Sequence, residues 1–362
     1  MCLVMRRHPI TRGSCLLAAA LTATFTALAL MTSLLGGGGA DSRLAAMPIT
    51  DEHAALAATT GQAAPSSAWG RAATELPGGL VAVIDTGVSP TASLAGRVEP
   101  GQSFVGGDAT ADENGHGTAV AGIIAGPTGV CRKCRILPLR VSAGASGVAS
   151  SDNIAAAVDA AVGLGATVVN LSMIASNPTE VERAAFARAT AAGVLVVAAA
   201  GNAASSIPSY PGSYPGVLSV GAAGDGGAIA EFSNRGSWVS VLAPACGRSN
   251  APDGAQVLFC GTSASAPYVA GVAAVLRATV PTATASDVIQ AIRRSSHPVE
   301  GVADGLIDPA AALLAIGGAA PVVATSVTSA PAKVVVQKRK RANGAGPTKA
   351  IRSLTKSVRR AS

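Results

Sequence analysis

The sequence is poor in charged and aromatic residues, which make up only 13% and 3% of its 362 positions. Hydrophobic residues account for 49%, and the chain contains 42 glycines. Disordered chains have the opposite composition, so this balance favours tightly packed layers of helices and strands. The length is sufficient for one large domain or two small ones, with a substantial core.

Acidic residues are absent from both ends of the chain. Residues 317–362 contain ten lysines or arginines, and residues 1–40 contain three arginines. Since the whole chain carries a net charge of +7, residues 41–316 carry −6. The last segment also lacks aromatic residues and any binding motif, so we expect no specific nucleic-acid partner. We expect it to contact anionic components of the cell envelope or to act as an inert solubilising tail.

The N-terminal segment, residues 1–40, has the pattern of an export signal. Its arginines precede an uncharged run over residues 14–40, and residues 38–40 are small enough for a cleavage site. The apolar part, Cys15 to Leu35, is longer than the usual signal core, so an uncleaved membrane anchor is the alternative. We therefore expect a secreted or extracytoplasmic protein, or one that this segment anchors in a membrane.

Few cysteines lie outside this segment, and their number is even. An even set in an exported chain favours disulfides. The simplest pairing joins Cys131 to Cys134 and Cys246 to Cys260, although the sequence leaves the crossed pairings open. A zinc site with four cysteine ligands is the alternative, but the second close pair of cysteines is missing. We predict neither a metal site nor a cofactor.

Apolar runs typical of buried strands alternate with helical patterns along the middle of the chain. This alternation predicts right-handed crossovers and a mostly parallel central sheet covered on both faces, which is a three-layer α/β/α sandwich. Strands are predicted over residues 80–84, 136–141, 167–171, 194–200, 217–220 and 239–243, and helices over 119–125, 151–164, 180–192 and 284–294. We expect a short processed or flexible arm over 41–64, one folded domain over 65–316, and a linker with a basic disordered tail over 317–362.

Three motifs place reactive side chains at the ends of these elements. Asp85 ends the first strand, where functional groups gather in open α/β sheets, or it forms an Asx turn. His116 begins a helix between two glycines, where it is a reactive group or a capping or core residue. Ser263 lies at the start of an apolar helix, whose dipole favours developing negative charge, or it serves close helix packing. Pro267 is expected to be tolerated because a first helical turn has free N–H groups.

Histidine is scarce, with only four in the chain. Two of them lie in the export segment and in the arm, so His116 and His297 are the only candidates for a catalytic base. His297 follows the predicted helix over 284–294 and precedes a proline. This position is typical of a residue that caps the C-terminus of a helix. His116 is therefore the predicted base.

Together the three motifs resemble the catalytic signatures of the subtilisin-like serine peptidases. They read Val-Ile-Asp-Thr-Gly over 83–87, Asn-Gly-His-Gly-Thr-Ala-Val-Ala-Gly over 114–122, and Gly-Thr-Ser-Ala-Ser-Ala-Pro over 261–267. Residues 168–172 are similar to the family's substrate-binding strand, and residues 199–202 to its oxyanion-hole segment. The resemblance runs from about Trp69 to Leu314. It implies a subtilisin-like fold and an exported, monomeric serine endopeptidase that acts on protein or peptide substrates through an acyl-enzyme intermediate.

The same resemblance implies a role for each residue. Ser263 would attack the scissile carbonyl, His116 would take its proton, and Asp85 would orient the imidazole. The amide of Asn202 and the backbone N–H of Ser263 would stabilise the oxyanion. Ser265 is the wrong serine by its place in the motif. The residues implied for substrate binding are Ser172, Met173, Ile174, Ala200, Gly201 and Ser209.

Two departures from the family pattern affect the expected specificity and stability. Ile174 stands where the family commonly has glycine, so its β-branched side chain is expected to crowd the specificity pocket, which has Ser209 at its base. We expect modest-sized apolar side chains there. The calcium loop is shortened to residues 126–130, and disulfides are expected to stabilise the domain instead. A catalytically silent surface-binding protein that uses the basic tail is the alternative function.

Overall fold

The structure is a computed structural model that describes residues 43–45, Trp69 and 75–318. The chain divides into two compact units, residues 1–323 and 324–362. The second unit lies outside the described residues, as do the predicted export segment and almost all of the predicted linker and tail. The domain boundaries therefore stay predictions.

An eight-stranded sheet forms the centre of the first unit, in the order β12-β9-β8-β7-β6-β2-β4-β3. Every neighbouring pair of strands in it is parallel. The predicted parallel sheet is confirmed. Its strands are β2 (Leu80–Asp85), β3 (Gln102–Ser103), β4 (Arg135–Arg140), β6 (Val168–Leu171), β7 (Leu195–Ala199), β8 (Val217–Ala223), β9 (Val241–Pro244) and β12 (Gly305–Leu306).

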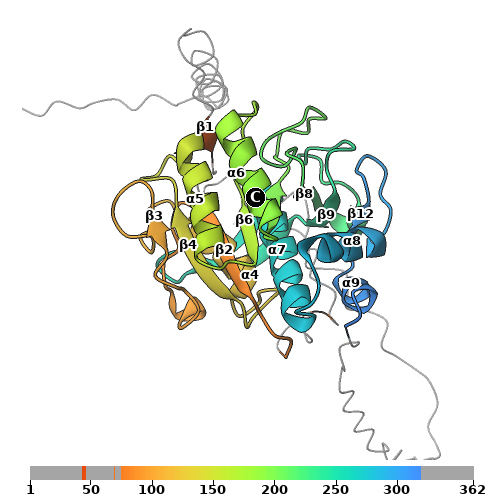
Figure 1. Cartoon of the computed structure of the whole chain (residues 1–362), viewed down its shortest axis with the longest axis horizontal. Coiled ribbons are helices and arrows are strands. Elements are labelled where there is room, and N and C mark those ends of the chain that lie inside the picture. The colour runs from red at the N-terminus through yellow and green to blue at the C-terminus, as the bar shows by residue number, and fades with distance from the viewer. Residues whose placement is uncertain (1–42, 46–68, 70–74, 319–362) are drawn as a thin grey trace, which may run out of the picture. The chain divides into compact units, whose positions relative to one another are not determined.

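Helices cover both faces of this sheet (Figure 1). Alternate residues of β2 separate the two cores: Val81 and Val83 pack with α4, α7, α8 and α9, whereas Ala82 and Ile84 pack with α5 and α6. Strands buried on both faces read as continuous apolar runs, which is why the sequence predicted them. The helices are α4 (His116–Ala125), α5 (Ser151–Gly163), α6 (Glu180–Ala191), α7 (Thr262–Thr279), α8 (Ala285–Ser295) and α9 (Pro309–Ala315).

The sequence did not predict two small antiparallel sheets. Strands β10 (Cys246–Asn250) and β11 (Gln256–Cys260) form a hairpin that leads directly into α7. Strand β1 (Arg43–Ala45), in the predicted arm, pairs with β5 (Val148–Ser150). Both sheets consist of short polar or mixed strands without the long apolar runs of the central sheet, so periodicity gave no signal for them.

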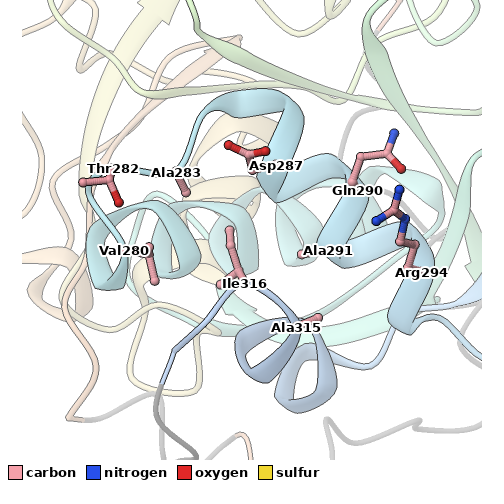
Figure 2. Close-up of a pocket in the computed structure, with 9 residues that line it drawn as sticks. All are labelled: Val280, Thr282, Ala283, Asp287, Gln290, Ala291, Arg294, Ala315 and Ile316. Carbon is pink, nitrogen blue, oxygen red and sulfur yellow. The ribbon is translucent and has the colours of Figure 1, made fainter.

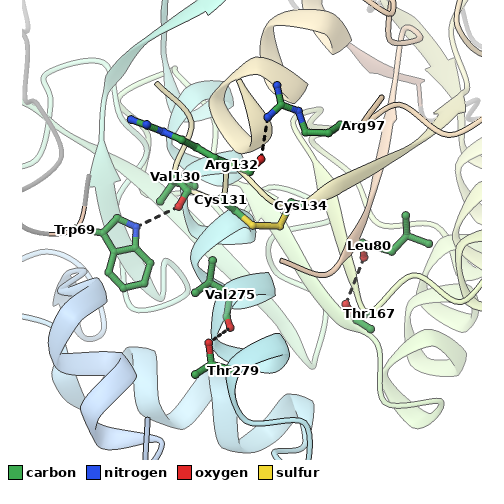
Figure 3. The surroundings of a disulfide bond; sticks show 10 residues. All are labelled: Trp69, Leu80, Arg97, Val130, Cys131, Arg132, Cys134, Thr167, Val275 and Thr279. Carbon is green, nitrogen blue, oxygen red and sulfur yellow. Dashed lines mark hydrogen bonds between the residues drawn. A yellow bond between two sulfur atoms is a disulfide. The ribbon is translucent and has the colours of Figure 1, made fainter. Parts of the chain in front are cut away.

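Both disulfides follow the simplest of the pairings that the sequence left open. The Cys246–Cys260 bond joins paired residues of the β10–β11 hairpin. The Cys131–Cys134 bond closes the turn between α4 and β4, as Figure 3 shows. Beside it the completely buried Trp69 donates from Nε1 to the carbonyl of Val130 over 3.3 Å. The turn therefore helps to hold the Trp69 side chain in the core.

A pocket of about 470 Å³ lies between the C-terminal end of α7, α8 and the end of α9 (Figure 2). None of the candidate residues from the sequence lines it. Among the described residues, no helix combines the length and hydrophobicity that crossing a membrane requires. The residues lining the pocket are Val280, Thr282, Ala283, Asp287, Gln290, Ala291, Arg294, Ala315 and Ile316.

Candidate active site

Asp85 and His116 form a buried pair at the C-terminal edge of the sheet. Oδ1 of Asp85, the last residue of β2, lies 2.8 Å from Nδ1 of His116, the first residue of α4. Both side chains are 0% exposed. The backbone N–H of Thr86 donates to the same carboxylate oxygen over 2.8 Å. Because both side chains are buried and in contact, the orientation of the imidazole is fixed.

The close approach of α4 to β2 depends on Gly117. A Cβ atom there would overlap the carbonyl oxygen of Gly87 and lie 3.1 Å from Cβ of Asp85. Only glycine, which has no side chain, lets the first turn of the helix come this near to the end of the strand. The glycine after the histidine is thus what brings the imidazole within hydrogen-bonding distance of the carboxylate.

Sequence reasoning missed a second buried carboxylate, Asp112. It binds the residue that follows Asp85 and the first turn of α4. Its Oδ1 accepts from Thr86 Oγ1 over 2.7 Å and from the N–H of Gly115 over 2.8 Å. Its Oδ2 accepts from Thr118 N over 2.8 Å and from Thr118 Oγ1 over 2.6 Å. Gly115, the N-cap of α4, has no side chain to cap the free N–H groups of the helix, so Asp112 does so instead. An acidic residue three positions before a glycine at a helix start is the signal that could have found it.

Ser263 lies in the first turn of α7 and is 6% exposed. Its Oγ donates to the carbonyl of Ser172 over 3.4 Å, and Ser172 Oγ donates back to the carbonyl of Ser263 over 3.2 Å. The Nδ2 of Asn170 in turn donates to Ser172 Oγ over 3.1 Å. The end of β6 therefore fixes the backbone and the hydroxyl of the candidate nucleophile.

The reason given for tolerating Pro267 from the sequence was wrong. Helix α7 begins at Thr262, so Pro267 lies beyond the first turn, at a position whose N–H would normally bond to the carbonyl of Ser263. Proline has no N–H to donate. That carbonyl accepts from Ser172 Oγ instead, and the proline thus allows the contact between β6 and α7.

The structure brings Asp85 and His116 together but shows no hydrogen bond between His116 and Ser263. Among the described residues, His116 Nε2 and Asp85 Oδ2 are buried without a hydrogen-bond partner. Buried polar atoms are nearly always paired, so these two atoms call for an explanation. Phe259, on β11, packs its ring edge-on against the imidazole, with centroids 5.3 Å apart. Sequence reasoning missed Phe259, whose strand it did not predict.

Asn202 lies just beyond the end of β7, and its side chain points to the start of α7. Its Oδ1 accepts from the N–H and from the Oγ1 of Thr262, each over 2.9 Å. A Cβ atom at Gly261 would lie 3.0 Å from Nδ2 of Asn202. Because the amide oxygen is held by two donors of Thr262, the amide nitrogen faces the backbone that leads into Ser263.

The predicted substrate-binding residues follow the ends of β6 and β7, two neighbouring strands. Ile174 lies close to the segment that follows β7, since its Cδ1 is 2.9 Å from where a Cβ of Gly201 would stand. Ser209 is buried and donates to the carbonyl of Ala200 over 2.6 Å. Met173 is different, because it is completely buried in the core with α5 and α6. Its side chain anchors the segment that follows β6 in this core.

A buried acid under this segment is a further feature that the sequence did not reveal. Glu182 of α6 accepts from the hydroxyl of Tyr214 over 3.1 Å, and the ring of Tyr214 lies 4.8 Å from that of Tyr210, the neighbour of Ser209. Burial raises the pKa of Glu182 and raises the pKa of Tyr214 to about 12. The backbones of Ala175 and Tyr210 are also paired. The N–H of Ala175 donates to the carbonyl of Tyr210 over 2.7 Å, and the N–H of Tyr210 donates to the carbonyl of Ala175 over 2.9 Å.

Two other sequence candidates lie outside this site. His297 contacts the carboxylate of Asp308 over 3.2 Å just beyond α8, and its side chain is 69% exposed. The hydroxyl of Ser265 lies within hydrogen-bonding distance of the carbonyls of Ala243, Pro244 and Gly261. In the described ranges, no cluster of three or more His, Cys, Asp or Glu side chains is arranged to hold a metal ion.

Known proteins are similar to this chain in sequence and in fold. The model of the Subtilase family matches residues 77–346. Alkaline elastase YaB from Bacillus sp. (strain YaB) is 39% identical over 205 residues, which are 54% of this chain and 53% of the relative. The chain thus spans about half the length of the curated relatives it matches.

Solved structures are similar over more of the chain. The crystal structure of MycP1 with the N-terminal propeptide removed has a TM-score of 0.60 and 32% identity, covering 68% of this chain and 94% of that one. A cold adapted subtilisin-like serine proteinase has a TM-score of 0.59 and 32% identity, covering 63% and 87%.

Proposed function

The chain belongs to the subtilase family, and from this premise we propose that it is an exported serine endopeptidase with Asp85, His116 and Ser263 as its catalytic residues. The observation that carries the proposal is the buried 2.8 Å contact between Asp85 and His116, with an unpaired Nε2 on the far side of the ring. A carboxylate on Nδ1 keeps the proton there and leaves Nε2 as an acceptor. This is the arrangement that activates a serine hydroxyl.

The reaction begins with a rotation of the Ser263 hydroxyl. In the structure this hydroxyl bonds to the carbonyl of Ser172. Catalytic hydrogen bonds often form fully only when substrate is bound. Substrate binding turns Oγ toward His116 Nε2, which takes its proton as Oγ attacks the scissile carbonyl. His116 then gives the proton to the leaving amine, and an acyl-enzyme remains on Ser263.

Negative charge that develops on the carbonyl oxygen is stabilised from two directions. The amide nitrogen of Asn202 and the backbone N–H of Ser263 donate to it. Ser263 also lies at the N-terminal end of α7, where the helix dipole favours negative charge. Water then attacks the acyl-enzyme as His116 takes one of its protons. The bond from the acyl carbon to Ser263 Oγ breaks, His116 gives the proton to Oγ, and the acyl group leaves as the carboxylic acid product.

The contact between Ile174 and Gly201 supports a shallow pocket for the P1 side chain, the one next to the attacked carbonyl. The enzyme is therefore proposed to prefer modest-sized apolar P1 residues in protein or peptide substrates. The pattern of residues 1–40 supports export. The basic residues 333–362 support contact with anionic components of the cell envelope.

Hydrolysis of a chromogenic peptide tests the proposal, with Ser263→Ala as the test variant and Ser265→Ala as the matched control. We expect the Ser263 variant to retain less than about one thousandth of the wild-type rate. The Ser265 variant keeps the nucleophile and should remain active. Equal rates in the wild type and the Ser263 variant would exclude a serine peptidase that acts through Ser263.

A truncated chain without residues 333–362 separates the proposal from the alternative of a silent surface-binding protein. The peptidase should keep its rate on small peptides and lose retention on anionic envelope material. If the truncation instead abolishes every measurable function and the full chain hydrolyses no peptide, the alternative is correct.

A further inference from the structure

Asn234 lies in the connection between β8 and β9 and is only 3% exposed. Both polar atoms of its side chain form hydrogen bonds to one short segment, which contains Asn202. Nδ2 donates to the carbonyl of Ala200 over 2.8 Å, and Oδ1 accepts from the N–H groups of Ala203 and Ser205, each over 3.0 Å. These bonds lie on both sides of Asn202.

The segment needs such support because it has left the sheet. Strand β7 ends at Ala199, and two of the next residues, Gly201 and Ala204, have positive φ angles of 106° and 51°. Positive φ is unfavourable for alanine, so surrounding contacts must hold this turn. The connection between β8 and β9 provides them through the side chain of Asn234 and through its backbone N–H, which donates to the carbonyl of Gly201 over 2.9 Å.

Thr262 and Asn234 hold Asn202 in different ways. Thr262 binds the side-chain oxygen of Asn202 from α7, which sets the rotation of the amide. Asn234 binds the backbone before and after Asn202. These bonds fix the backbone position from which the Asn202 side chain extends. An oxyanion donor must be placed to within a fraction of an ångström, because it acts only when it meets the developing charge.

We propose that Asn234 is a positioning residue of the oxyanion hole, which fixes the backbone around Asn202 so that its amide nitrogen meets the developing oxyanion. The inference rests on the proposed function, in which Asn202 is the oxyanion donor. In this proposal Asn234 acts on kcat through Asn202. Its loss therefore lowers kcat more than it changes KM, and has no effect on kcat once Asn202 is removed.

The test measures kcat and KM on a chromogenic peptide for the full chain and for the variants Asn202→Ala, Asn234→Ala and the double variant. Asn202→Ala should lower kcat by about 10²–10³, a magnitude that comes from subtilisin itself and not from this structure. We expect Asn234→Ala to lower kcat about tenfold, because a small displacement of a catalytic group has this order of effect. KM should stay within about twofold, and the double variant should match Asn202→Ala.

Two further variants keep the outcome decisive. The carboxylate of Asn234→Asp has the same shape as the amide but cannot donate to the carbonyl of Ala200, so this variant should lower kcat. It keeps the inference testable if the alanine variant fails to fold. Asn250→Ala removes another buried asparagine, 8% exposed, whose Nδ2 donates to the carbonyl of Gly254 in the β10–β11 turn region. This control should leave kcat unchanged and shows the effect of losing a buried amide elsewhere.

The possible failures are distinguishable. An active wild type in which Asn202→Ala lowers kcat, but in which neither Asn234 variant does, overturns the inference and leaves the proposed function intact. So does an Asn234→Ala effect of the same size in the wild type and in the Asn202→Ala background, because it shows an independent structural role. A full chain that hydrolyses no peptide overturns the proposed function and this inference together.

Discussion

Replacing Ile174 with glycine should widen the range of P1 side chains that the enzyme accepts. The Cδ1 atom of Ile174 lies 2.9 Å from the position of a Cβ at Gly201, so the isoleucine fills space between the segments that follow β6 and β7. An aromatic P1 side chain needs this space and a P1 alanine does not. The substitution should therefore raise kcat/KM for phenylalanine at P1 relative to alanine.

The expected size follows from the atoms removed. Isoleucine to glycine takes away four side-chain carbons, and burial of one CH₂ group is worth about 0.8 kcal/mol, so an aromatic ring that refills the space gains up to about 3 kcal/mol. That is about 150-fold in kcat/KM, and imperfect filling with a more flexible backbone reduces it. We expect the ratio of phenylalanine to alanine to rise between about tenfold and about 150-fold.

The assay compares two chromogenic peptides that differ only at P1. Ile174→Ala, which keeps one methyl group, should give an intermediate ratio. Met173→Leu is the matched control, because Met173 is the neighbour of Ile174 but is buried in the core on the side of α5 and α6. A ratio that Ile174→Gly leaves within about twofold of the wild type would refute the assignment of Ile174 to the P1 pocket.

Three further predictions follow from the described contacts. Peptide hydrolysis should rise from acid to neutral pH, because only a neutral imidazole at His116 accepts the serine proton; a flat profile in a folded enzyme contradicts that role. Burial raises the pKa of Glu182, so the native state binds its proton more tightly than the unfolded chain, and the stability gained from protonation is lost as pH rises through the raised pKa. Glu182→Gln should therefore gain in Tm over the wild type between about pH 4 and 7, and a constant difference argues against the buried acid. Replacing Cys246 and Cys260 with serine opens a loop with a sequence separation of 14, which should lower the free energy of unfolding by about 3 kcal/mol in a denaturant titration; a loss below about 1 kcal/mol would show that the bond constrains the unfolded chain little.

The sheet and its helices were predictable because both faces of the sheet are buried. Val81 to Ile84 are apolar without interruption, and the same is true of β7, so composition alone marks these strands. The β10–β11 hairpin was not predictable in this way. It carries Arg248 and Asn250 among its residues, and a disulfide holds its ends together. Its stability comes from contacts that periodicity does not register.

The candidate site was predictable where its residues stand in local motifs and unpredictable where they act across the chain. Asp85, His116 and Ser263 each have characteristic neighbours in sequence. Asn234 is recognisable only from its partners, since it binds backbone groups of residues about thirty positions before it. A polar residue that satisfies distant backbone groups leaves no pattern in its own neighbourhood.

The most direct test of the central claim is to map the site of covalent labelling by a fluorophosphonate probe. The purified full chain is labelled, digested and analysed by mass spectrometry, beside His116→Ala and Ser263→Ala. We predict one adduct, on Ser263, that forms in the wild type, slows strongly in His116→Ala and is absent from Ser263→Ala. An adduct on another residue, or equal labelling of the wild type and Ser263→Ala, would contradict the assignment of Ser263 as a nucleophile activated by His116 and Asp85.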